Sequence, residues 1–130
     1  AQAPGQIELR GGVTGREKRD LLLSAGFFVF PPSEPEGHPR VVLEAIAAGL
    51  PVIATDRGAI AETVVDGESG FILPRPDPAD LADRILRLHD DAELRQAMSK
   101  AARTRYLERF TQETSDRALA EWLGSLATSR

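Results

Sequence analysis

The sequence predicts an α/β fold, in which an open parallel sheet has a helix between its strands and is followed by a run of helices. Residues 27–30 and 51–54 are apolar at every position, which is typical of strands that are covered on both faces of a parallel sheet. The Ala-rich segment 41–49 between them ends at a glycine, a common stop signal for a helix. The order strand, helix, strand is that of a βαβ unit.

A short strand and a helix are expected ahead of this unit. Residues 7–9 are a strand candidate that ends at a pair of glycines. Thr14, with Glu17 three positions later, has the spacing of a capping box. This pattern predicts a helix that runs through about Ser24.

Alternation of helix and strand continues beyond residue 54. The sequence predicts a short helix over 59–65, turns over 66–70 and a third strand over 71–73. The pattern then becomes helical, because Asp77 suits an N-cap and Pro78 suits the first helical position.

The C-terminal part of the chain is expected to be all helical. A first helix starts at Asp77, a second covers about 92–107, and a third begins after Thr111. We predict one domain over residues 1–130, with the sheet in 1–76 and the helices in 77–130. The apolar face of the last helix consists of Leu119, Trp122, Leu123 and Leu126.

Composition excludes several classes of function. The chain of 130 residues has 16 Lys and Arg against 20 Asp and Glu, a net charge of -4, so a nucleic-acid partner is not expected. It contains no Cys, which removes disulfides and thiolate catalysis and makes the cytoplasm the default location. No apolar run has the roughly 18 residues that a membrane span needs. The chain begins at Ala1 without a Met, which suggests a piece of a longer protein.

The loop after the first buried strand carries the candidate site. Ligands of open parallel sheets bind at the carboxyl ends of the strands. Residues 31–40 lead into a helix whose free N–H groups and dipole favour an anion such as a diphosphate. Gly37 allows a ligand to approach the backbone. Glu44, about 7.5 Å further along the helix than Pro39, has a side chain that leans back toward that end.

The chemistry of this segment suggests a nucleotide sugar. A carboxylate accepts hydrogen bonds through two oxygens and therefore suits neighbouring hydroxyls of a ribose or hexose. The spacing alone is weak support, because Glu113 and Glu121 on an expected helix surface are also eight residues apart. Other interpretations stay open for single residues: a helix cap for Glu36, a packing role for His38 and a solvated side chain for Arg40.

A motif in this region resembles a known family. The stretch FFVFPPSEPEGHPRVVLEAIAAGLPVIAT, followed by GAIAETVVDGESGFIL, is similar to the C-terminal donor-binding domain of retaining GT-B glycosyltransferases of group one, whose fold is Rossmann-like. The main family pattern, E-G-x-P-x4-E-A-x-A-x-G-x-P-V-I, matches at Glu36, Gly37, Pro39, Glu44, Ala45, Ala47, Gly49, Pro51, Val52 and Ile53. A second family pattern, E-x4-G-x2-G, follows at Glu62, Gly67 and Gly70.

The resemblance implies roles for these residues. Glu36 is the candidate catalytic residue, near the reacting carbon of the transferred sugar, and Glu44 accepts hydrogen bonds from the ribose. The reaction implied is transfer of a sugar from a nucleoside diphosphate with retained anomeric configuration and without a metal ion or other cofactor. The implied donor-binding residues, including those whose backbone amides hold the sugar and diphosphate, are Gly37, His38, Pro39, Arg40, Val41 and Glu44.

The resemblance also implies that part of the machinery lies elsewhere. The family's acceptor-binding N-terminal domain is missing, and Arg16, Lys18 and Arg19 do not map onto the upstream cations that usually hold the diphosphate. The chain alone is therefore expected to be inactive, and peripheral membrane association would come only through the absent half. The family's last helix packs on that half, so we expect Trp122 to be under-covered here. The alternative is a non-catalytic nucleotide-sugar-binding or interaction module that keeps the fold.

Overall fold

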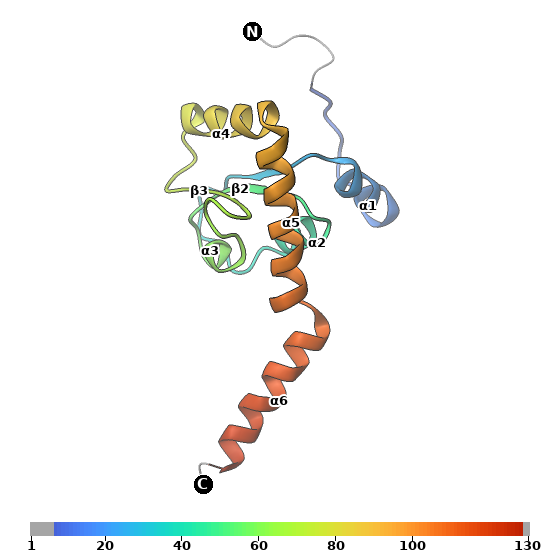
Figure 1. Ribbon diagram of the computed structural model, residues 1–130, viewed down its shortest axis with the longest axis vertical. Helices are drawn as coiled ribbons and strands as arrows, with labels where there is room; N and C mark the ends of the chain where they lie inside the picture. The colour runs from blue at the N-terminus through green and yellow to red at the C-terminus, as the bar shows by residue number, and fades with distance from the viewer. Residues whose placement is uncertain (1–6, 129–130) are drawn as a thin grey trace.

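A computed structural model describes residues 7–128 and confirms the predicted α/β architecture (Figure 1). Three parallel strands form one open sheet in the order β1-β2-β3. The first part of the chain forms α1 (Gly15–Ser24), β1 (Phe28–Phe30), α2 (Arg40–Ala47), β2 (Val52–Thr55), α3 (Ile60–Thr63) and β3 (Gly70–Leu73). The C-terminal helices are α4 (Pro78–Asp90), α5 (Ala92–Arg109) and α6 (Gln112–Thr128).

The central strand β2 divides the core into two layers. Because side chains of a strand alternate between faces, Val52 and Ala54 pack with α2, whereas Ile53 packs with α4 and α5. All four residues of β2 are buried, as the apolar sequence predicts. Helix α5 contributes to both layers, since Ala102 belongs to the first cluster and Met98 to the second. The sheet is thereby fixed from both sides, and its carboxyl edge supports the loops of the candidate site.

Strand β1 differs from its prediction. Its three residues, Phe28 to Phe30, are only half-buried, although the sequence predicted cover on both faces. The reason is its position at the edge of the sheet, where it pairs with β2 alone. An apolar run therefore predicted the strand correctly, but not how completely neighbouring elements cover it.

The predicted strand over residues 7–9 is wrong. These residues have no regular secondary structure, and Leu9 is 94% exposed. A short strand is stable only when it pairs with a neighbour, and Phe28 of β1 aligns with Val52 of β2 rather than with this segment. The helix that follows is confirmed with Thr14 as its N-cap residue, but no side-chain hydrogen bond of a capping box forms.

The start of α4 follows its prediction closely. The carboxylate of Asp77 accepts hydrogen bonds from the N–H groups of Ala79 (2.9 Å) and Asp80 (3.2 Å), and Pro78 occupies the first turn. Because these N–H groups have no partner within the helix, Asp77→Ala is expected to lower the free energy of unfolding by about 1 kcal/mol. Urea unfolding measures this loss. Asp83→Ala, an exposed change within the same helix, is the control and should stay within about 0.5 kcal/mol of wild type.

Helix α6 leaves the body of the molecule. It continues beyond α5 and projects away from the sheet (Figure 1), and none of its residues is buried. Trp122 is 58% exposed and Leu119 53% exposed, which confirms that the part of the chain described by the structure leaves part of this apolar face under-covered. Of the helices in residues 7–128, none combines the length and the apolar character that a membrane crossing requires.

Candidate functional site

The loop from Pro31 to Pro39 follows β1 at the carboxyl edge of the sheet and is tied to β2. The buried hydroxyl of Thr55, the last residue of β2, donates to the carbonyl oxygen of Pro32 at 2.5 Å. Arg57 donates from Nε to the carbonyl oxygen of Ser33 at 3.2 Å. The loop is therefore held by side chains from the neighbouring strand and the segment after it.

Gly58 brings the next loop into direct backbone contact with Glu36. Its φ of +56° lies in the left-handed region, and a Cβ atom placed on it would lie 1.3 Å from the carbonyl oxygen of Glu36. The N–H of Ala59 donates to the carbonyl oxygen of Gly37 at 2.9 Å. Gly58 therefore has a role that an ordinary turn glycine lacks, because only glycine fits this close approach.

The N-terminus of α2 presents unpaired backbone donors. Among residues 7–128, no acceptor is recorded for the N–H groups of Gly37, His38, Arg40 and Val41. Pro39 precedes the helix as its N-cap residue and has no N–H, so it can contribute shape but not a hydrogen bond. Unpaired N–H groups together with the helix dipole make this end of α2 suitable for an anion.

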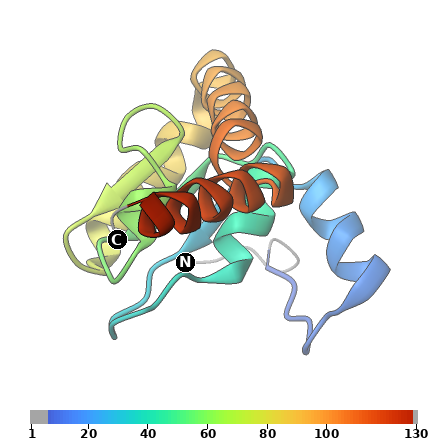
Figure 2. The same cartoon turned by 90° about the horizontal axis from the view of Figure 1, so that it is seen from below.

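Glu44 faces helix α1. Its carboxylate lies 2.9 Å from Nζ of Lys18 and 3.5 Å from Nε of Arg40, and its side chain is 25% exposed. It lines a pocket of about 330 Å³ between α1 and α2, which both orthogonal views show side by side (Figure 2). The remaining wall of the pocket is largely apolar and is formed by Leu22, Leu23, Ala47 and Ala48 together with Gly15 and Arg19.

His38 is engaged on the side of α3. Its Nε2 lies 2.6 Å from the hydroxyl oxygen of Thr63, and its ring meets the ring of Phe110 edge to face, with centroids 5.8 Å apart. Phe110 ends α5 directly before α6 begins. The side chain of His38 therefore connects the loop to two helices, which is the packing interpretation that the sequence left open.

Glu36 and Arg40 have freer side chains. Glu36 is half-buried, and no hydrogen bond or ion pair of its carboxylate is recorded among the described residues. The side chain of Arg40 is 92% exposed. Within residues 7–128, its only ion pair is with the carboxylate of Glu44. The structure thus brings Arg40 and Glu44 together and leaves the carboxylate of Glu36 available.

Sequence reasoning gave no role to three residues that shape this site. Lys18 contacts Glu44, Arg57 holds the loop, and Thr63 contacts His38. A usable signal existed for Arg57, because it lies two positions after the last residue of a buried strand, where loops of the carboxyl edge begin. No signal existed for Lys18, since its contact joins residues that are 26 positions apart on different helices.

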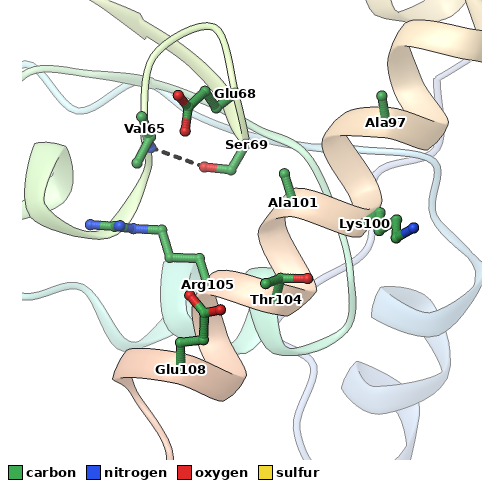
Figure 3. A pocket seen from close by; sticks show the side chains of 9 residues that line it. All are labelled: Val65, Glu68, Ser69, Ala97, Lys100, Ala101, Thr104, Arg105 and Glu108. Carbon is green, nitrogen blue, oxygen red and sulfur yellow. Dashed lines mark hydrogen bonds between the residues drawn. The ribbon is translucent and has the colours of Figure 1, made fainter.

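Figure 3 shows a second pocket, whose lining does not include Glu44 or the loop from Pro31 to Pro39. It has a volume of about 360 Å³ and lies between α5 and the connection from α3 to β3. Its Arg105 already donates to the carbonyl oxygens of Thr63 (2.9 Å) and Glu62 (2.5 Å), and Ser69 accepts from the N–H of Val65. None of the predicted site residues lines it. Within residues 7–128, no three His, Asp or Glu side chains gather closely enough to hold a metal ion.

Comparisons with known proteins agree with this architecture. The family model described as glycosyl transferases group 1 matches residues 1–105. An uncharacterised glycosyltransferase of Methanocaldococcus jannaschii is 36% identical over 94 residues, which are 72% of this chain and 26% of that protein. The capsular polysaccharide biosynthesis glycosyltransferase CapM of Staphylococcus aureus is 37% identical over 86 residues, 66% of this chain and 22% of CapM.

A solved structure extends the comparison to the fold. The crystal structure of Anabaena HepE in complex with UDP-glucose matches 85% of this chain and 30% of HepE with a TM-score of 0.76 and 26% identity. The chain thus spans about a quarter of the length of the two curated relatives above. With the family model covering most of the chain and the fold in agreement, the chain belongs to the glycosyl transferases group 1 family.

Proposed function

We propose that this chain is the donor-binding part of a glycosyltransferase that uses a nucleoside-diphosphate sugar and retains the anomeric configuration. The observation that carries the proposal is the set of unpaired N–H groups at the start of α2, such as those of Arg40 and Val41, with Glu44 of the pocket wall one turn further along the same helix. An anion and a sugar diol need these two kinds of group at one place. The known binding of UDP-glucose by HepE supports the choice of donor class.

Each part of the donor has a counterpart in this arrangement. The diphosphate and transferred sugar would lie against the N–H groups of Gly37, His38, Arg40 and Val41. The ribose would enter the pocket between α1 and α2, where the carboxylate of Glu44 accepts its hydroxyls and the apolar wall contacts the base. His38 and Pro39 would act through backbone and shape, because the His38 side chain is bonded to Thr63 and Pro39 has no N–H.

The proposed reaction needs little chemistry from the protein itself. The bond between the anomeric carbon and the diphosphate breaks, and the diphosphate leaves with the electron pair. The acceptor oxygen bonds to the same face of the sugar, and its proton passes to the leaving phosphate oxygen. Backbone donors aimed at the leaving group stabilise its developing charge without a metal ion. Glu36, whose carboxylate has no recorded partner in the described part of the chain, would contact the sugar near that carbon.

The acceptor would be bound by a second domain. We propose that the exposed face of α6 around Trp122 packs on that domain. The relatives are long enough to contain such a domain, because the matched segments make up only 26% and 22% of their lengths. The role of CapM in capsular polysaccharide biosynthesis suggests a cell-envelope or polysaccharide sugar as the product class.

Titration with nucleotide sugars tests donor binding directly. We expect UDP-glucose or GDP-mannose to shift the backbone amide resonances of residues 36–44 and of α1 near Lys18 in a saturable manner. Residues 112–128 of α6 serve as the internal control, because they lie outside the proposed site and should not shift. Saturable shifts confined to the pocket beside Arg105, or none in residues 36–44 with either donor, would contradict the proposal.

A further inference from the structure

Arg57 joins the loops that follow all three strands. Its Nε donates to the carbonyl oxygen of Ser33 after β1 at 3.2 Å. Its Nη1 donates at 2.9 Å both to the carbonyl oxygen of its neighbour Asp56 after β2 and to that of Pro74 after β3. The guanidinium of one half-buried arginine therefore connects the loops along the carboxyl edge of the sheet.

The residues after Arg57 hold the same loop further along. Gly58 lies against the carbonyl group of Glu36, and the N–H of Ala59 donates to the carbonyl oxygen of Gly37. Three consecutive residues thus contact the loop after β1 at Ser33, Glu36 and Gly37 in order. A displacement of this segment would move the backbone of Glu36 and the donors that follow it.

A guanidinium is well suited to such a connection. It is planar, always charged, and carries its donors in a rigid fork, so several carbonyl oxygens are held in one fixed arrangement. A lysine ammonium has the same charge, but it is a compact group on a flexible stem and does not reproduce this geometry. The three carbonyl contacts therefore depend on the geometry of the Arg57 guanidinium and not on its charge alone.

We propose that Arg57 is a positioning residue of the donor site: it acts through the loop from Ser33 to Gly37 and does not touch the donor. This inference rests on the proposed donor-binding function. Its consequence is that the loop is arranged before any donor arrives, and pre-arrangement of a binding loop lowers the cost of binding.

Two variants separate positioning from charge. In Arg57→Lys and Arg57→Gln alike, we expect the amide resonances of residues 33–38 to shift in the ligand-free chain and the Kd for UDP-glucose to rise about tenfold, which corresponds to about 1.4 kcal/mol. The salt dependence of binding should stay that of wild type, because no charge contact with the donor is lost. Thermal unfolding checks that both variants fold. Arg57→Lys keeps size and charge, so it is the substitution that should disturb folding less.

Arg75 is the matched control. It is an exposed arginine in the loop after β3, and no hydrogen bond or ion pair of its side chain is recorded within residues 7–128. Arg75→Lys and Arg75→Gln should leave both the loop resonances and the Kd unchanged. Wild-type affinity in Arg57→Lys with a loss only in Arg57→Gln would mean that charge suffices and would overturn the proposal, as would unshifted resonances of residues 33–38. If wild type binds no donor, the proposed function fails, while the ligand-free resonances still decide whether Arg57 positions the loop.

Discussion

Replacing Glu44 by alanine is expected to weaken the binding of the nucleotide sugar to this chain by roughly tenfold to a hundredfold. Hydrogen bonds to a charged group contribute about 1.5–3 kcal/mol, and each 1.4 kcal/mol changes the Kd tenfold. The carboxylate of Glu44 lies at the wall of the pocket between α1 and α2, where the ribose hydroxyls are proposed to bind. Isothermal titration calorimetry measures the change in Kd, with the nucleotide sugar that shifts the amide resonances of residues 36–44 as the ligand.

Two controls separate this effect from a general loss of charge. Glu121→Ala removes a glutamate from the exposed helix α6 and should leave the Kd unchanged. Arg40→Ala removes one ion-pair partner of Glu44 but keeps the backbone N–H that is proposed to bind the donor. Because the side chain of Arg40 is 92% exposed, its loss should change the Kd little. Equal small losses for Glu44→Ala and Glu121→Ala would argue against the ribose contact.

Replacing Gly58 by alanine is expected to lower the free energy of unfolding by about 3 kcal/mol or more, since overpacking costs about 1–3 kcal/mol and a non-glycine residue held at positive φ costs a similar amount. The added Cβ would overlap the carbonyl oxygen of Glu36, at 1.3 Å, so the backbone must move. The amide resonances of Glu36 and Gly37 should therefore shift strongly. Urea unfolding and the spectrum of the ligand-free variant measure the two effects.

Gly67 provides the matched control for this substitution. It also has a positive φ, +81°, but a Cβ on it would meet no atom within 4 Å. Gly67→Ala should therefore carry only the conformational cost, about 1–2 kcal/mol, and leave the resonances of Glu36 in place. A loss of stability in Gly58→Ala no larger than that in Gly67→Ala would mean that the contact with Glu36 is not tight.

Local patterns were sufficient to predict most elements. The apolar run at β2 and the helical spacing at α4, with Asp77 as its cap, correspond to the structure because their signals come from residues close in sequence. The failures share a cause. Residues 7–9 had the composition of a strand but no partner, and β1 had the composition of a covered strand but an edge position. Pairing and cover depend on elements distant in sequence, which no local pattern reports.

The candidate site, too, could be predicted from the sequence only in part. The motif identified Glu36 and Glu44, and residues 31–40 were expected to lead into a helix whose start could accept an anion. The contacts that fix these residues come from Lys18 on α1 and from Arg57 after β2. Lys18 has ordinary surroundings in the sequence, and the position of Arg57 after a buried strand does not show what it contacts, so only the three-dimensional arrangement reveals the roles of both residues.

The sequence by itself determined the α/β class, the helix start after β1 and the motif of the family, because each depends on residues at fixed short spacing. The tertiary structure decided that Gly58 packs against Glu36, that His38 is bonded to Thr63, and that Trp122 remains exposed on a projecting helix. The physical reason is that hydrogen bonds, steric contacts and burial act between groups close in space, and folding brings these groups together from distant parts of the chain.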